Sequence, residues 1–307
     1  MKPKIIIITG PTASGKTKLS IDIAKQFNGE IISADSIQIY KEANIGSAKV
    51  THEEMQNIPH HLINICNPAD SFSAGQFVKL ARKLIIEITK KGKLPIIVGG
   101  TGLYISSLLY PLSTTAKRNE QLRKKLEQLR EREGQIALYN KLKEIDSITA
   151  MKIHPNQTDR IIRAIEIYYE TGIKKSQLIK SQQSDYDYLL LIISGEREDI
   201  YKKINERVDK MINNGLIEEV ENLVKKYHLT NENQLMQGIG YKETLMYLNN
   251  EISKEELAEL IKQRTRNYAK RQLTWFKKMP NANFITLNNI SEITNKVKDF
   301  LGSEKNE

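Results

Sequence analysis

Eight residues near the N-terminus constrain the fold of this chain more than any other stretch. They read Gly10-Pro11-Thr12-Ala13-Ser14-Gly15-Lys16-Thr17, which fits the pattern G-x-x-x-x-G-K-[ST] of a P-loop. The apolar run Ile5–Ile8 precedes them, and apolar residues at helical spacing follow. A strand, a glycine-rich loop and a helix in this order place backbone N–H groups at a helix N-terminus, where they attract oxyanions.

The motif also predicts a ligand. Gly10 and Gly15 allow the backbone to fold tightly, Lys16 places a charge on the terminal phosphate, and the Thr17 hydroxyl holds Mg²⁺ as the metal ligand. All of these contacts recognise phosphates, and none recognises a base or a sugar. We therefore expect residues 10–17 to bind a diphosphate or polyphosphate with Mg²⁺ as cofactor, and the motif leaves open whether ATP is bound.

Alternation of apolar runs with helical patterns over residues 1–113 predicts an α/β fold, in which helices flank a parallel sheet as in P-loop NTPases. From residue 114 the sequence pattern changes: Leu and Ile recur at helical spacing among Arg, Lys and Glu. A strand returns at Leu189–Ile193. We therefore expect a P-loop core domain made of residues 1–113 and 188–307, with an all-helical insertion domain at residues 114–187.

Two polar residues follow apolar strands and are candidates for chemistry. Asp35 comes after the second strand, where it can accept a proton from a nucleophile or bind Mg²⁺. P-loop enzymes of phosphoryl transfer usually carry a second acid after an apolar strand. Here the strand Ile96–Val98 runs instead into Gly99-Gly100-Thr101. This argues against an ordinary ATPase motor or GTPase, and Thr101 offers a hydroxyl in that place.

The chain is basic, with 47 Lys and Arg against 37 Asp and Glu and a net charge of +10. This charge favours an anionic partner larger than the P-loop ligand, and nucleic acid fits best. Residues 262–278 contain seven basic side chains and no acid, interleaved with aromatic residues. That composition suits RNA backbones with stacked bases, although a solvated helix face would look the same. Lys203 and Arg207 lie four apart on a predicted helix, where they could clamp a diphosphate or face solvent.

Composition also bears on location. Cys66 is the single cysteine, so no intramolecular disulfide can form, which agrees with the cytoplasm. No apolar run approaches ~18 residues, so we expect no membrane span. The first strand begins within a few residues of Met1, which leaves no room for a signal peptide. We expect a cytoplasmic monomer.

Several further motifs accompany the P-loop along the chain. They are Ser33–Tyr40, Ile45–Lys49, Pro59–Leu62, Val98–Tyr104, Ile153–Asn156, Arg160–Glu166, Gly238–Glu243 and Tyr268–Phe276. Together they resemble the tRNA dimethylallyltransferase family from about residue 4 to residue 279. The resemblance implies transfer of a dimethylallyl group from dimethylallyl diphosphate to N6 of adenosine 37, immediately 3′ of the tRNA anticodon. The products would be N6-dimethylallyladenosine and diphosphate, and the P-loop would bind the diphosphate leaving group.

The resemblance also implies roles for individual residues. Asp35 would take the proton from N6, while Thr101 and Arg207, also catalytic, would stabilise the leaving diphosphate with Lys16, Thr17 and Mg²⁺. The insertion would grip the anticodon stem-loop. The implied tRNA-binding residues are Asp35, Ser36, Ile37 and Gln38; Asp159, Arg160, Ile161, Ile162 and Arg163; and Gln237, Gly238, Gly240, Tyr241 and Lys242. Two positions depart from the family pattern, with Lys203 where Arg is expected and Asn64 where Asp is expected.

Two other functions remain to be weighed. A P-loop small-molecule kinase would use Lys16, Thr17 and a second-strand Asp in the same way, but it needs a mobile lid that carries arginines, and no stretch reads as one. A nucleotide-gated RNA-binding module needs no base at Asp35. Neither the set of tRNAs nor the choice between dimethylallyl and isopentenyl diphosphate follows from the sequence.

Overall fold

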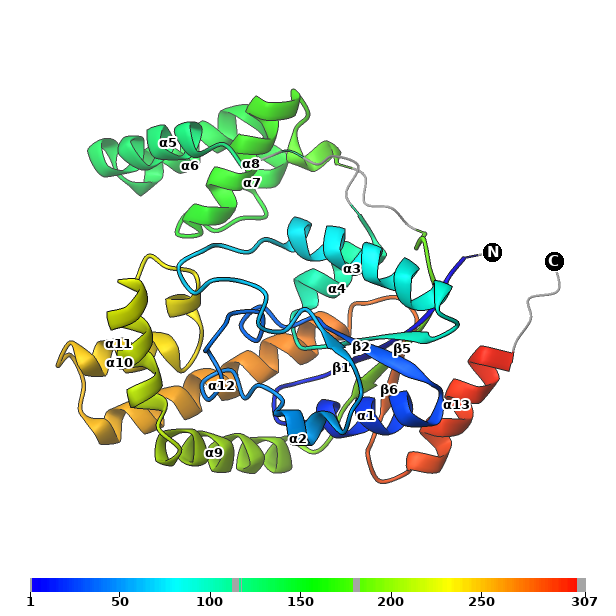
Figure 1. Cartoon of the computed structure of the whole chain (residues 1–307). Coiled ribbons are helices and arrows are strands. Elements are labelled where there is room, and N and C mark those ends of the chain that lie inside the picture. Colours follow the sequence, from blue (N-terminus) through cyan, green and yellow to red (C-terminus); the bar gives the residue numbers. More distant parts are fainter. Residues whose placement is uncertain (1, 112–115, 117, 179–182, 303–307) are drawn as a thin grey trace. The chain divides into compact units, whose positions relative to one another are not determined.

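The computed structural model describes residues 2–111, 116, 118–178 and 183–302. These residues form two compact units (Figure 1). Unit 1 comprises Met1–Leu109 and Asp185–Glu307, and unit 2 comprises Tyr110–Ser184. No helix in the described ranges is long and apolar enough to cross a membrane.

A six-stranded parallel sheet forms the centre of unit 1, which confirms the predicted α/β class. Its order is β3-β2-β4-β1-β5-β6. The strands are β1 (Lys4–Thr9), β2 (Gly29–Ser33), β3 (His60–His61), β4 (Leu94–Val98), β5 (Asp187–Ile193) and β6 (Ala282–Ile285). Ile5–Ile8 in central β1 are fully buried, because helices cover both faces of the sheet.

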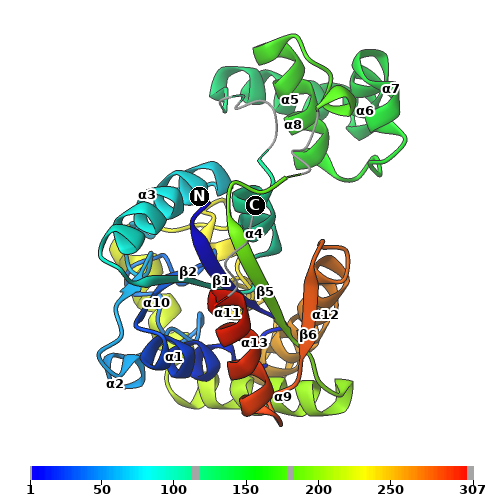
Figure 2. The same ribbon diagram turned by 90° about the vertical axis from the view of Figure 1, so that its right-hand side faces the viewer.

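Helices lie on both faces of this sheet, as Figure 2 shows, with α1 and α13 on one side and α3 and α4 on the other. Ile6 and Ile8 of β1 face α1 and α13 in one apolar cluster. The helices of unit 1 are α1 (Lys16–Gln26), α2 (His52–Met55), α3 (Ala74–Lys90), α4 (Gly102–Leu109), α9 (Arg197–Asn213), α10 (Leu216–Tyr227), α11 (Tyr241–Leu248), α12 (Lys254–Phe276) and α13 (Ile290–Gly302), with a 3-10 turn at Leu235–Gln237. Serine N-caps with reciprocal glutamine or glutamate bonds start α3 at Ser73 and α12 at Ser253.

Unit 2 is helical in its described part and has its own core. Its helices are α5 (Glu120–Glu133), α6 (Gln135–Ile145), α7 (Ser147–Ala150) and α8 (Thr158–Thr171), followed by a 3-10 turn at Lys175–Gln177. Leu126, Leu138 and Ile165 are buried together, and left-handed Gly172 ends α8. Glu166 is buried among them. Burial opposes its ionisation, but hydrogen bonds from Arg123 and Arg163 outweigh burial and lower its pKa to about 2.

Candidate functional site

Residues 10–17 turn from β1 into α1 at the carboxyl edge of the sheet. Gly10 has a φ of 147° and Gly15 a φ of 89°, values that favour glycine. A Cβ at Gly10 would lie 2.6 Å from the Ile193 carbonyl oxygen, so no larger residue fits there. Gly15 is the N-cap of α1 and provides no side-chain cap, which leaves the first N–H groups of α1 for a ligand.

Two side chains of the loop fit an anion. Lys16 Nζ donates to the carbonyl oxygens of Gly10 at 3.1 Å and Pro11 at 2.6 Å. Burial, and then the nearby charge of Arg207, lower the pKa of Lys16 to about 7. Among the described residues, the Ser14 hydroxyl is one of the few buried side-chain polar atoms without a hydrogen-bond partner. A phosphate oxygen bound in the loop would supply the missing hydrogen-bond partner of this hydroxyl.

Arg207 reaches the P-loop from α9. Its Nη1 donates to Thr12 Oγ1 at 3.4 Å, and burial lowers its pKa despite the opposing charges of Glu54 and Asp35. Lys203, one turn earlier on the same helix, is exposed. The two basic residues therefore differ in environment, and Arg207 is the one that contacts the P-loop.

Asp35 and Thr101 lie at the ends of neighbouring strands and are joined through Ser36. Asp35 Oδ1 accepts the backbone N–H groups of Ile37 at 2.8 Å and Gln38 at 3.2 Å, which fixes its carboxylate. Thr101 Oγ1 accepts the N–H of Ser36 at 3.1 Å and lies 3.3 Å from the Ser36 hydroxyl. Backbone N–H groups thus hold the Asp35 carboxylate and the Thr101 hydroxyl in place beside the P-loop.

Gln272 on α12 belongs to this site; it lies within the motif Tyr268–Phe276, but no role for it follows from the sequence. Its side chain is 5% exposed. Oε1 accepts the Thr12 N–H at 2.9 Å, and Nε2 donates to the Gly100 carbonyl at 3.0 Å. The Tyr268 hydroxyl lies 3.5 Å from the same carbonyl, and burial with the charge of Asp35 raises its pKa to about 12. One amide therefore joins the P-loop to the loop that carries Thr101.

We expect Gln272→Leu to lower the free energy of unfolding by about 1–3 kcal/mol, because the Thr12 N–H and the Gly100 carbonyl would lose their partners. Urea denaturation measures this change. Gln263→Leu, at an exposed position on the same helix, is the matched control. Equal losses of stability in the two variants would contradict the bridging role.

Three of the seven basic residues in the stretch 262–278 are engaged within the protein, whereas Lys270, Arg271, Lys277 and Lys278 are exposed. Lys262 bonds Asp209 at 2.8 Å and Glu259 at 3.1 Å. Arg264 bonds Glu243 at 2.5 Å, and Arg266 Nη1 donates to Asn205 at 2.7 Å. These residues hold α12 against α9 and α11. For this part of the stretch, the structure favours the structural interpretation over direct RNA contact.

Two of the three segments predicted to bind tRNA lie side by side in unit 1. Ile37 packs on Gly238, where a Cβ would lie 2.9 Å from Ile37 Cδ1. Gln237 and Lys242 are exposed, whereas Tyr241 is fully buried. Gly240, within this segment, is the N-cap residue from which α11 begins.

The third segment begins α8 in unit 2. Asp159 and Arg160 are exposed, whereas Ile161 and Ile162 are buried in the helical core. Arg163 donates to Glu166 at 2.5 Å and to the Ala116 carbonyl at 2.7 Å. Only the first two side chains of this segment are therefore fully presented on the surface.

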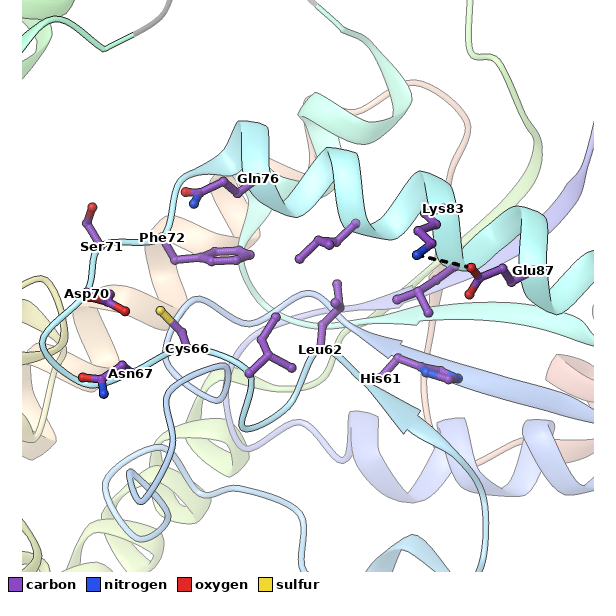
Figure 3. A pocket seen from close by; sticks show the side chains of 13 residues that line it. His61, Leu62, Cys66, Asn67, Asp70, Ser71, Phe72, Gln76, Lys83 and Glu87 are labelled. Atoms are coloured by element: carbon purple, nitrogen blue, oxygen red, sulfur yellow. Dashed lines mark ion pairs between the residues drawn. The ribbon is translucent and has the colours of Figure 1, made fainter.

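A pocket of about 740 Å³ lies elsewhere, between α3 and residues 61–72 (Figure 3). Its lining includes His61, Leu62, Cys66, Phe72 and Leu84. None of the residues with a predicted role in chemistry lines it. Asn64 Oδ1 accepts a hydrogen bond from Lys49 Nζ at 2.6 Å, so the position expected to be Asp still serves as an acceptor.

A metal would find few protein ligands at the P-loop. No group of three or more His, Cys, Asp or Glu side chains suited to a metal occurs in the described parts of the chain. Thr17, exposed at the start of α1, offers one hydroxyl. Mg²⁺ is commonly held by one or two protein groups together with substrate phosphates, so this arrangement fits it.

Comparison with known proteins identifies relatives along nearly the whole chain. A family model described as IPP transferase matches residues 38–279. A tRNA dimethylallyltransferase of Caldanaerobacter subterraneus subsp. tengcongensis is 50% identical over 287 residues, and the match covers 90% of each chain. The crystal structure of a tRNA isopentenylpyrophosphate transferase from Bacillus halodurans superposes with a TM-score of 0.74 at 41% identity, covering 98% of this chain and 97% of that one. A eukaryotic dimethylallyltransferase acting on tRNA superposes with a TM-score of 0.85 at 32% identity, covering 99% and 81%.

Proposed function

Because this chain belongs to the IPP transferase family, whose relatives are tRNA dimethylallyltransferases, we propose that it transfers a dimethylallyl group to N6 of the adenosine 3′ of the tRNA anticodon. The donor is dimethylallyl diphosphate. One observation carries this proposal beyond the family relation: Asp35 stands beside the P-loop, while β4 is followed by Gly99-Gly100-Thr101, which contains no acid. This arrangement suits a diphosphate leaving group and an amine nucleophile better than hydrolysis of a nucleotide.

Asp35 acts as the general base. The N6 lone pair is delocalised into the adenine ring, so the amine becomes an effective nucleophile only as its proton leaves. The N6–carbon bond forms, the allylic carbon–oxygen bond breaks, the proton passes to Asp35, and diphosphate departs. The adenosine must leave its stack to reach the carboxylate, as base-modifying enzymes require.

The P-loop binds the diphosphate. Lys16, Arg207 and the N–H groups at the start of α1 neutralise charge that develops as the carbon–oxygen bond breaks. Thr101 adds a hydroxyl. Thr17 would hold Mg²⁺, which, when bound, supplies further positive charge to the diphosphate.

The RNA is bound by both units in this proposal. Residues 35–38 and 237–242 of unit 1 contact the anticodon loop, and residues 159–163 of unit 2 contact the stem-loop through the exposed Asp159 and Arg160. Unit 2 as a whole grips the anticodon stem-loop. One chain supplies every residue invoked here, so we expect a monomer to be active.

A small-molecule kinase would share Lys16, Thr17 and Asp35. The relatives and solved structures favour the transferase, because they are tRNA-modifying transferases and each match covers most of both chains. Mass spectrometry of an anticodon stem-loop incubated with either dimethylallyl diphosphate or ATP separates the two functions.

The affinity of the free enzyme for dimethylallyl diphosphate should fall as the pH rises above about 7, the pKa of Lys16. Below this pH Lys16 is already a cation, whereas above it binding requires uptake of a proton. The dissociation constant should therefore increase by about tenfold per pH unit until the pKa of the complex is reached. Isothermal titration measures this constant. Lys16→Arg stays charged and should flatten the profile, and an unchanged slope in that variant would contradict the assignment.

A further inference from the structure

Glu219 joins two segments that are far apart in the sequence: residues 44–46 and the start of α11, which belongs to the proposed RNA-binding segment 237–242. From α10, its Oε2 accepts the backbone N–H groups of Asn44 at 2.8 Å and Ile45 at 2.7 Å. Oε1 accepts the N–H of Gly46 at 3.1 Å and the hydroxyl of Tyr241 at 2.9 Å. One carboxylate thus ties three consecutive loop residues to the first residue of α11.

The same segments are also in direct contact. A Cβ at Gly46 would lie 2.7 Å from the Tyr241 ring, so glycine allows the loop to lie flat against this fully buried ring. Burial, and then the adjacent Glu219, raise the pKa of the Tyr241 hydroxyl well above its ordinary value. The hydroxyl therefore stays protonated and keeps donating to the carboxylate.

The loop depends on such bonds for its path. Residues 36–49 contain no helix and, apart from an isolated bridge at Tyr40, no strand pairing. At its start, Asp35 fixes Gln38 through a backbone N–H, and Gln38 Nε2 closes the loop on the Ser47 and Ala48 carbonyls. Glu219 fixes the middle of the loop. Hydrogen bonds and the loop backbone therefore connect Asp35 to Tyr241 through Gln38, residues 46–48 and Glu219.

We propose that Glu219 is a positioning residue for the RNA acceptor: it holds residues 44–46 on Tyr241 and so keeps segments 35–38 and 237–242 as one preformed surface. The inference rests on the proposed function, because it takes these segments to bind tRNA. A carboxylate suits the task, since its two oxygens accept several N–H and O–H groups at once. Glu219 acts through the loop and α11, so its removal should affect RNA binding more than the chemical step.

Glu219→Ala should raise the dissociation constant for an anticodon stem-loop by about tenfold or more, because charge-assisted bonds that preform the surface are lost. Filter binding without prenyl donor measures this constant. The KM for dimethylallyl diphosphate should stay within about twofold of the parent value. Glu219→Gln retains one acceptor oxygen and should fall between the parent and the alanine variant. Tyr241→Phe should give a smaller change of the same kind.

Glu221→Ala is the matched control, because Glu221 lies on the same helix and bonds Lys225 at 2.6 Å on its surface. Thermal melting verifies that each variant folds, and Glu219→Gln and Tyr241→Phe carry the test if the alanine variant does not. Unchanged RNA affinity, or equal weakening of RNA and diphosphate binding, would overturn the inference. A parent enzyme that binds the RNA but transfers no prenyl group would contradict the proposed function instead.

Discussion

Replacing Asp35 by asparagine should reduce the single-turnover rate of prenyl transfer by about a thousandfold, the scale of general-base catalysis. Asn keeps the side-chain oxygen that accepts the N–H groups of Ile37 and Gln38, so the local backbone should be preserved. It cannot take the proton from N6. Rapid-quench measurement with saturating stem-loop RNA and dimethylallyl diphosphate isolates the chemical step.

The stem-loop affinity of Asp35→Asn should stay close to that of the parent enzyme. Asp22→Asn, at an exposed position on α1, is the matched control and should retain full activity. Turnover at the parent rate in Asp35→Asn would remove Asp35 from the mechanism. Loss of RNA binding together with activity would instead assign this carboxylate to recognition.

Lys16→Ala should lower kcat by about 100-fold to 1,000-fold, the cost of removing one preorganised donor to a developing negative charge. The ammonium lies among the Gly10 and Pro11 carbonyls, within the loop that we propose to receive the diphosphate. Steady-state kinetics with both substrates varied separates the loss in kcat from any change in KM.

Lys18→Ala provides the comparison, because Lys18 is an exposed lysine on the same helix. RNA affinity should be unchanged in both variants. If Lys16→Ala lost RNA binding and kept its rate with saturating RNA, the P-loop would be part of the RNA site and the diphosphate assignment would fail.

The phosphate loop and its neighbours could be predicted because the topology of a parallel sheet places them. Gly10, Asp35 and Thr101 each follow a strand, and carboxyl ends of parallel strands meet at one edge. Strand order was not needed for that prediction. The spacing of Lys203 and Arg207 suggested a diphosphate clamp but favoured a solvated face, and the family resemblance supplied the catalytic role of Arg207.

Gln272 and Glu219 could not be predicted in the same way. Each bonds backbone groups more than 170 residues away in sequence, Thr12 for Gln272 and Asn44 for Glu219. Glu219 lies in no motif, and Gln272 lies in the motif Tyr268–Phe276. In neither case does the residue type at a helical position indicate which distant backbone groups it contacts. Only tertiary packing of α12 and α10 brings them to the loops.

Charge counted over a short segment does not show which side chains are free to bind RNA, as the basic stretch illustrates. Residues 262–278 contain no acid, so the sequence suggests that their basic side chains are free to bind RNA. The acids that neutralise Lys262 and Arg264 include Asp209 on α9 and Glu243 on α11, outside this stretch.

The most direct test of this account follows the mass of an anticodon stem-loop whose loop carries adenosines 3′ of the anticodon. The RNA is incubated with the protein, Mg²⁺ and either dimethylallyl diphosphate or ATP. The account predicts a gain of one C5H8 unit with the prenyl donor and none with ATP. No gain with the prenyl donor, together with release or transfer of phosphate from ATP, would contradict it.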